Sequence, residues 1–134
     1  MSNFKGYLKD KDGNKIYPDD YDTGWQTLSL ASNIQMTSAS NYPARQRKVG
    51  NIVYLEGLIE LVSEDASVDI QLGTVKWPPS KTQYCAGVTS MAEDLYSNKA
   101  KVVRINTNGT IQTHGSNISI SRWISLYGIS YFVD

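Results

Sequence analysis

Apolar and polar residues alternate with a period of two through residues 53–62, directly after a Gly-Asn pair at positions 50 and 51. The apolar side carries Val53, Leu55, Ile59 and Leu61. The polar side carries Tyr54, Glu56 and Glu60. Because successive side chains of a strand point to opposite faces, the pattern predicts one half-buried β-strand that follows a turn. A shift of one residue would bury two glutamates, so the pattern also defines the register of this scaffold strand.

Shorter alternating stretches recur along the chain and predict further strands, at residues 24–30, 68–73, 84–91, 118–121 and 123–133. Residues 33–40 are polar and ambiguous, and predict either a weak strand or a loop. The two prolines of residues 77–79 cannot donate to a ladder, which places that segment at a sheet edge or crossing. About nine short strands separated by turns predict an all-β fold: a single small antiparallel β-sandwich or barrel of jelly-roll-like form.

The apolar pattern of residues 101–114 selects one hairpin register. A three-residue loop at residues 107–109, with Gly109 in the left-handed conformation, keeps apolar residues together on one face. This register sets Ile105 opposite Ile111, Val103 opposite Thr113, Arg104 beside Gln112, and Val102 beside His114. A two-residue loop would set Arg104 with Thr113 and scatter both faces. The pattern therefore favours the three-residue loop.

Length and charge narrow the classes of function. The 134 residues suit one folded domain, which we place at residues 23–134 after a linker at residues 1–22. Thirteen basic and thirteen acidic residues cancel, which argues against nucleic acid or an anionic membrane as partner. Cys85 is the only cysteine, so no disulfide can form within the chain. Residues 1–20 are polar and no apolar run approaches the ~20 residues of a membrane span, so we expect a soluble protein without a classical signal peptide.

The linker contains a spacing that resembles the start of a calcium-binding loop. Asp10, Asp12 and Asn14 occupy its first, third and fifth positions. Gly13, however, comes at the fourth rather than the sixth position, and Tyr21 stands where a bidentate glutamate is required. We therefore interpret this segment as a solvated Asp-Gly turn, and we expect no metal and no cofactor.

Four stretches of the chain carry a family resemblance: 23–30 (TGWQTLSL), 42–61 (YPARQRKVGNIVYLEGLIEL), 102–113 (VVRINTNGTIQT) and 120–134 (ISRWISLYGISYFVD). They resemble the C-terminal head domains of phage tail-tip, baseplate and tail-fibre proteins, and most nearly the receptor-binding proteins of siphophages that infect lactococci, streptococci and related Gram-positive bacteria. A fifth stretch, 7–18 (YLKDKDGNKIYP), resembles the linker that precedes a head or carbohydrate-binding module in such virion proteins. These are motifs of a fold, and none of them is catalytic.

The resemblance implies a homotrimer of β heads on the tail tip or baseplate of a virion, made in the bacterial host cytoplasm. It implies binding of a host cell-wall saccharide and contact with other baseplate or tail proteins, with neither nucleic acid nor membrane insertion involved. Weak sites repeated on a trimer would act by avidity, which can raise affinity by roughly 10²- to 10⁴-fold. Family members vary most in the loops that contact sugar, so no binding residue carries over by motif.

Sugar recognition needs aromatic faces and planar polar groups, and the polar face of the predicted hairpin supplies the second kind. The candidate saccharide-binding residues are Arg104, Gln112 and His114 on that face, with Trp123, Asp94, Tyr96 and Asn98 from neighbouring segments. Three of them have an alternative role: Trp123 also suits a core, His114 an unassigned surface position, and Arg104 a cross-strand or subunit pairing. Trp25 and Trp77 are assigned to packing.

Catalysis finds little support in the sequence, and we expect no enzyme. His114 is the only histidine, and no serine lies in a GxSxG context. Adjacent acids could serve glycoside hydrolysis in principle, at Asp19 and Asp20, Glu64 and Asp65, and Glu93 and Asp94. Two alternatives to a saccharide-binding head therefore remain: a structural tail subunit that binds no sugar, and a polysaccharide-degrading tail-fibre domain.

Overall fold

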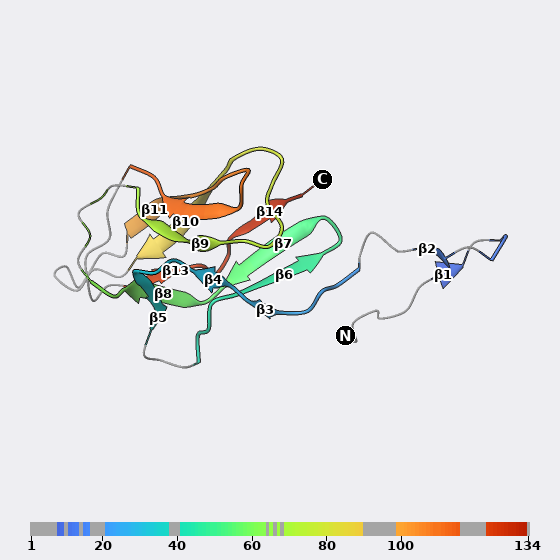
Figure 1. Cartoon of the computed structure of the whole chain (residues 1–134), viewed down its shortest axis with the longest axis horizontal. Helices are drawn as coiled ribbons and strands as arrows, with labels where there is room; N and C mark the ends of the chain where they lie inside the picture. The colour runs from blue at the N-terminus through green and yellow to red at the C-terminus, as the bar shows by residue number, and fades with distance from the viewer. Residues whose placement is uncertain are drawn as a thin grey trace.

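Antiparallel strands dominate the structure, as the alternating pattern predicts (Figure 1). The computed structural model describes residues 8–9, 11–13, 15–16, 21–37, 41–63, 65, 67, 69–89, 99–115 and 123–133. The strands in these ranges are β1 (Leu8–Lys9), β2 (Lys15–Ile16), β3 (Gln26–Thr27), β4 (Ser29–Leu30), β5 (Ile34–Met36), β6 (Arg45–Val49), β7 (Ile52–Glu56), β8 (Leu58–Leu61), β9 (Gln71–Thr74), β10 (Gln83–Thr89), β11 (Lys99–Ile105), β12 (Thr110–Thr113), β13 (Trp123–Ser125) and β14 (Ser130–Phe132). Within these ranges no helix has the length and apolar character needed to cross a membrane.

Two larger sheets make up the head. One has eight strands in the order β4-β9-β12-β11-β10-β13-β8-β5, and the other has four in the order β14-β7-β6-β3. β1 and β2 pair with each other in the linker, around a turn at residues 11–13. Every pairing is antiparallel, so the predicted all-β class is confirmed. The ambiguous stretch 33–40 contains β5, whereas the predicted strand at 118–121 lies outside the described residues.

The scaffold strand predicted for residues 53–62 is divided in two, and the prediction of one continuous strand is wrong. β7 belongs to the four-stranded sheet and β8 to the eight-stranded sheet. Gly57 separates them with a φ of 118°, and a Cβ there would lie 2.5 Å from backbone atoms of Pro43 and Ala44. Only glycine fits both the conformation and the close approach. The predicted alternation of burial is nevertheless confirmed on both sides of the break, at Val53, Leu55, Ile59 and Leu61.

A second crossing between the sheets interrupts the strand predicted for residues 24–30. β3 pairs with β6 in the four-stranded sheet, and β4 pairs with β9 in the eight-stranded sheet. Leu28 lies at the crossing, where its amide donates to the Ala44 carbonyl at 3.0 Å and its side chain is buried. The chain thus passes between the sheets at Leu28 and again at Gly57, and both crossings contact Ala44.

The hairpin of β11 and β12 has the predicted register. Val103 lies opposite Thr113, Arg104 opposite Gln112, and Ile105 opposite Ile111. Gly109 has a φ of 91°, and the Asn106 amide donates to the Thr110 carbonyl at 2.9 Å. The three-residue loop and its left-handed glycine are therefore confirmed. The apolar face of this hairpin is buried, which leaves the polar face outward.

One cluster of buried apolar side chains draws on both sheets. It comprises Leu28, Ile34, Ala44, Val53, Leu55, Ile59, Leu61, Ile70, Leu72, Val75, Val103, Ile105, Ile111, Ile124, Leu126, Ile129, Tyr131 and Val133. Trp77 packs against the cluster outside the strands, which confirms its assignment to packing, and the Tyr131 hydroxyl donates to its carbonyl at 2.7 Å. Burial raises the pKa of the Tyr131 hydroxyl.

Candidate functional site

The polar face of the β11–β12 hairpin brings three of the predicted site residues together. Arg104 lies opposite Gln112, and Arg104 Nη1 is 3.3 Å from His114 Nδ1. The Tyr84 ring packs edge-on against the His114 ring with centroids 5.6 Å apart, and Asp69 Oδ1 is 3.7 Å from His114 Nδ1. Sequence reasoning therefore located a real cluster of polar side chains on the eight-stranded sheet.

Several polar groups of this cluster already have partners within the chain. Gln112 accepts a hydrogen bond from Asn106 Nδ2 at 2.9 Å, and Asp69 Oδ1 accepts one from the Gly115 amide at 3.0 Å. The side chains of His114 and Asp69 are both nearly half exposed. An exposed pairing of this kind contributes little free energy, because water competes for both partners. The hairpin cluster could contact a ligand only with the hydrogen-bonding groups that these internal contacts leave unused.

The remaining predicted site residues do not join this cluster. Trp123 begins β13 and lies opposite Glu60 of β8, where it is half-buried. β13 pairs with the end of β10 near Thr89, whereas Tyr84 and the hairpin cluster lie near its start, roughly 20 Å away along the strand. Asp94, Tyr96 and Asn98 lie outside the described residues.

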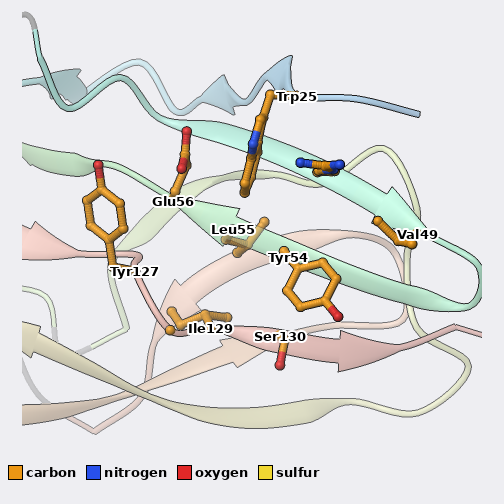
Figure 2. A pocket seen from close by; sticks show the side chains of 10 residues that line it. Trp25, Val49, Tyr54, Leu55, Glu56, Tyr127, Ile129 and Ser130 are labelled. Atoms are coloured by element: carbon orange, nitrogen blue, oxygen red, sulfur yellow. The ribbon is translucent and has the colours of Figure 1, made fainter. Parts of the chain in front are cut away.

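A pocket of about 560 Å³ opens instead on the outer face of the four-stranded sheet (Figure 2). Its lining comes from the segment just before β3, from β6 and β7, from the turn that precedes β14 and from the start of β14. The lining residues are Trp25, Arg47, Val49, Tyr54, Leu55, Glu56, Tyr127, Gly128, Ile129 and Ser130. The volume lies within the ~300–1,000 Å³ that is usual for ligand pockets.

Strand register aligns the polar side chains of the pocket in rows across the sheet. Arg47 of β6, Tyr54 of β7 and Ser130 of β14 form one row, because Tyr54 lies opposite both of the others. Arg45 and Glu56 form the neighbouring row. These are outward positions of the sheet. The sequence pattern had marked only Tyr54 and Glu56 among them, as the polar side of the scaffold strand.

Trp25 forms one wall of the pocket, although the sequence had assigned it to packing. Its ring lies 5.5 Å from the Arg45 guanidinium carbon and 5.7 Å from that of Arg47. The side chain remains 36% exposed. Arginines at i and i+2 of one strand face the same side, which is the only sequence signal for this contact. The prediction missed it because Trp25 lies some twenty residues before them and outside any strand.

A pair of ion pairs holds this wall in place. Arg47 donates from Nε to Asp22 Oδ1 at 2.9 Å and from a second nitrogen to Asp22 Oδ2, so that the pairing is bidentate. The hydrogen bond from Arg47 lowers the pKa of the Asp22 carboxyl below its ordinary value. Arg45 donates from Nε to Glu56 Oε1 at 2.5 Å. The two arginines and two carboxylates around the pocket are thus paired with each other.

Residues 21–23, at the junction of linker and head, lie along β6 through further backbone contacts. The Thr23 amide donates to the Lys48 carbonyl at 2.9 Å, and the Lys48 amide donates to Thr23 Oγ1 at 3.0 Å. The Gly50 amide donates to the Tyr21 carbonyl at 3.0 Å. These contacts position Trp25 over the sheet. The division at residue 22 remains a prediction, and Tyr21 already contacts the head.

Tyr127 stands on the opposite side of the pocket, in the turn between β13 and β14. The turn is closed by Gly128, with a φ of 82°, and by the Tyr127 amide, which donates to Ser125 Oγ at 3.2 Å. The Tyr42 ring packs edge-on against the Tyr127 ring with centroids 6.4 Å apart. Figure 2 shows Tyr127 and Tyr54 on either side of Leu55 and Ile129.

The pocket suits reversible binding of a ligand that has both an apolar face and hydroxyl groups. Trp25, Tyr54 and Tyr127 offer aromatic surface, and Glu56 and Ser130 offer hydrogen-bonding oxygens in neighbouring rows of the sheet. Among the described lining residues Glu56 is the only carboxylate, and that group is paired with Arg45. Each adjacent acid pair considered for hydrolysis has at least one member outside the described residues. Within the described ranges no group of three or more potential ligands could hold a metal ion.

Comparison with known proteins identifies the fold. The structure is similar to the crystal structure of the head domain of phage bIL170, described as one of the receptor-binding domains of lactococcal phages. The TM-score is 0.58 at 17% sequence identity, over 82% of this chain and 97% of that one. No family model matches the chain, and no curated protein matches it. The predicted head-domain fold is therefore confirmed as a fold shared with a lactococcal phage protein.

Proposed function

We propose that this chain is the head domain of a phage receptor-binding protein, and that it attaches the virion to a saccharide on the host cell wall without cleaving it. The fold shared with the bIL170 head domain supports the receptor-binding role. At this level of identity the fold alone is common to the two proteins, so the role must be supported by the surface of this chain.

The observation that carries the proposal is the pocket on the four-stranded sheet. It combines three exposed aromatic side chains with a carboxylate and a hydroxyl, in a concavity formed by two strands and the segments beside them. Aromatic rings bury the C–H face of a sugar, and planar polar groups pair with its hydroxyls. The hairpin cluster of Arg104, Gln112 and His114 offers the polar half of this chemistry on the eight-stranded sheet, and it is the alternative location.

The proposal includes a homotrimer on the tail tip or baseplate, in contact with other tail proteins. A single shallow pocket binds weakly, and three linked copies on each of many trimers would supply the missing affinity as avidity. Light scattering tests the assembly, because the trimer predicts three times the 14.9 kDa mass of the chain. A stable monomer would remove the avidity argument.

Binding to purified cell walls tests the function. The full chain is labelled, incubated with walls from a panel of lactococcal and streptococcal strains, and sedimented with them. We expect the chain to bind the walls of at least one strain, and Tyr127→Ala to weaken that binding at least about tenfold. The matched control is Tyr84→Ala, which removes an exposed tyrosine from the hairpin cluster and should leave binding within about twofold of the parent chain.

Three outcomes contradict the proposal in different ways. Absence of binding to every wall favours a structural tail subunit. Release of reducing ends from a bound wall favours a polysaccharide-degrading domain. Loss of binding in Tyr84→Ala, with binding retained in Tyr127→Ala, moves the site to the hairpin cluster.

A further inference from the structure

We infer that the pocket on the four-stranded sheet selects an uncharged sugar unit and disfavours acidic or phosphorylated ones. This inference rests on the proposed saccharide-binding function and names the class of ligand. It follows from the pairing of the charged side chains that the structure describes around the pocket, because Arg47 is paired with Asp22 and Arg45 with Glu56.

Arg47 is the cation that lines the pocket, and its guanidinium is committed to Asp22. Two of its nitrogens donate to the two carboxylate oxygens of Asp22, the geometry in which arginine would otherwise grip a carboxylate or phosphate ligand. Asp22 is held in turn by the Gly24 amide, which donates to Oδ1 at 2.8 Å. The Asp22 side chain is only 9% exposed, so the pair is shielded from solvent more than an ordinary surface ion pair.

Arg45 is committed in the same way. It donates a hydrogen bond to Glu56 Oε1. Its guanidinium also contacts the Trp25 ring, as the guanidinium of Arg47 does. An anionic ligand in the pocket would therefore meet two cations that are already neutralised and the carboxylates that neutralise them. Binding it would require an arginine to leave a carboxylate, and a buried carboxylate left unpaired is unfavourable.

The uncommitted surface of the pocket suits a neutral ring. Tyr54 and Tyr127 lie on either side of Leu55 and Ile129 and present aromatic surface, as Figure 2 shows. Glu56 retains acceptor capacity beyond its contact with Arg45, because a carboxylate has about four acceptor positions. Ser130, which carries a hydroxyl, lies directly opposite Tyr54 on the adjacent strand. Sugar hydroxyls can both donate and accept, so they match these groups without bringing a net charge.

Competition with matched sugar pairs tests the inference. The parent chain bound to cell walls is challenged with glucose and glucuronic acid, galactose and galacturonic acid, and N-acetylglucosamine and its 1-phosphate, each up to about 50 mM, well above the millimolar dissociation constant of a weak site. We expect at least one neutral sugar to compete, at a concentration at least about fivefold below that of its acidic partner. Wall binding should also change less than about twofold between low and high salt, because no ion pair forms with the ligand.

Two outcomes overturn the inference and leave the proposed function standing. In one, the chain binds walls but an acidic or phosphorylated sugar competes better than its neutral partner. In the other, the chain binds walls and none of the uncharged sugars competes. Absence of wall binding overturns the proposed function itself, so the two failures are distinguishable.

A charge variant sharpens the test, because Asp22→Asn removes the carboxylate that occupies Arg47. We expect this variant to gain affinity for glucuronic acid relative to glucose by at least about fivefold, since the guanidinium becomes available to the ligand. Asp69→Asn is the matched control in the hairpin cluster, and it should leave that ratio within about twofold of the parent value. Thermal unfolding of both variants confirms that they are folded under the assay conditions. If folded Asp22→Asn has the same ratio of glucuronic acid to glucose affinity as the parent chain, the claim that Asp22 keeps Arg47 from binding an anionic ligand is contradicted.

Discussion

The pocket and the hairpin cluster use the same kinds of side chain and differ in how those side chains are supported. Each region has an arginine, a carboxylate and a tyrosine. The hairpin cluster lies on the outward face of neighbouring strands, where His114 and Asp69 are nearly half exposed and Arg104 is partly buried. In the pocket, the segment just before β3 and the turn before β14 stand on two sides of the sheet and form a concavity between them. Composition alone therefore does not separate a site from an ordinary surface.

The difference teaches that the pocket depends on how the chain passes between the sheets. The crossings at Leu28 and Gly57 connect the four-stranded sheet to the eight-stranded sheet. The segment just before the first crossing brings Asp22 and Trp25 into contact with Arg47 of β6. The hairpin needs only its own register. Substitutions at the crossings should consequently damage the pocket region more than equivalent substitutions elsewhere.

The largest effect is expected at Gly57. Gly57→Ala places a Cβ 2.5 Å from backbone atoms at a φ of 118°, so the crossing cannot form without moving Ala44. We expect a loss of at least about 4 kcal/mol in the free energy of unfolding, or failure to fold. Gly128→Ala is the control, because its φ of 82° is also positive but its Cβ would meet no atom within 4 Å. It should lose only about 1–2 kcal/mol, measured by urea unfolding. Equal losses in the two variants would contradict the role of the crossing.

An intermediate effect is expected at Gln46, which lies beneath the pocket on the inner side of β6. It is 4% exposed, accepts from the Lys76 amide at 2.8 Å and donates to the Thr27 carbonyl at 3.4 Å. Gln46→Ala leaves the Lys76 amide without this partner and opens a cavity, for a loss of about 2–3 kcal/mol. Gln112→Ala, in the half-buried hairpin cluster, should lose less than about 1 kcal/mol in the same unfolding assay. A larger loss of unfolding free energy in Gln112→Ala than in Gln46→Ala would contradict the stronger dependence of the pocket region on buried support.

A smaller, pH-dependent effect is expected at Asp22. Its pKa in the folded protein is lowered below the ordinary value of 3.8, chiefly by the hydrogen bond from Arg47. A carboxyl with a depressed folded-state pKa stabilises the protein above its unfolded pKa and loses that contribution as the pH falls through the folded value. The stability difference between the parent chain and Asp22→Asn should be constant at neutral pH and should shrink below about pH 4. Urea midpoints measured across this range test it, and a difference that grows in acid would refute the pairing.

The sequence predicted local structure well where one period applied without interruption. The hairpin of β11 and β12 was predicted to the residue, because only one loop length kept Ile105 with Ile111 and Val103 with Thr113. The buried positions of β7 and β8 were also predicted correctly. The break at Gly57 was missed because glycine occupies an apolar position of the alternation, so that the pattern continues through a change of sheet.

The pocket was harder to predict because its members meet only after folding. Tyr54 and Glu56 were recognised as the outward side of a scaffold strand, without a function. Trp25 comes from the segment just before β3 and Tyr127 from the turn before β14, and no local pattern joins them to that strand. Arg104, Gln112 and His114 were found as a group because they are neighbours within one hairpin. Their assignment to saccharide binding, with Trp123, Asp94, Tyr96 and Asn98, remains a prediction.

Mapping a bound saccharide onto the chain tests the central claim most directly. The full chain, labelled with ¹⁵N, is titrated with saccharide solubilised from a wall that it binds, and amide shifts are followed by NMR. The account predicts the largest shifts at pocket residues, among them Tyr54, Tyr127 and Ser130, with little change around the hairpin cluster. Largest shifts at Arg104, Gln112 and His114, with the pocket unchanged, would contradict it.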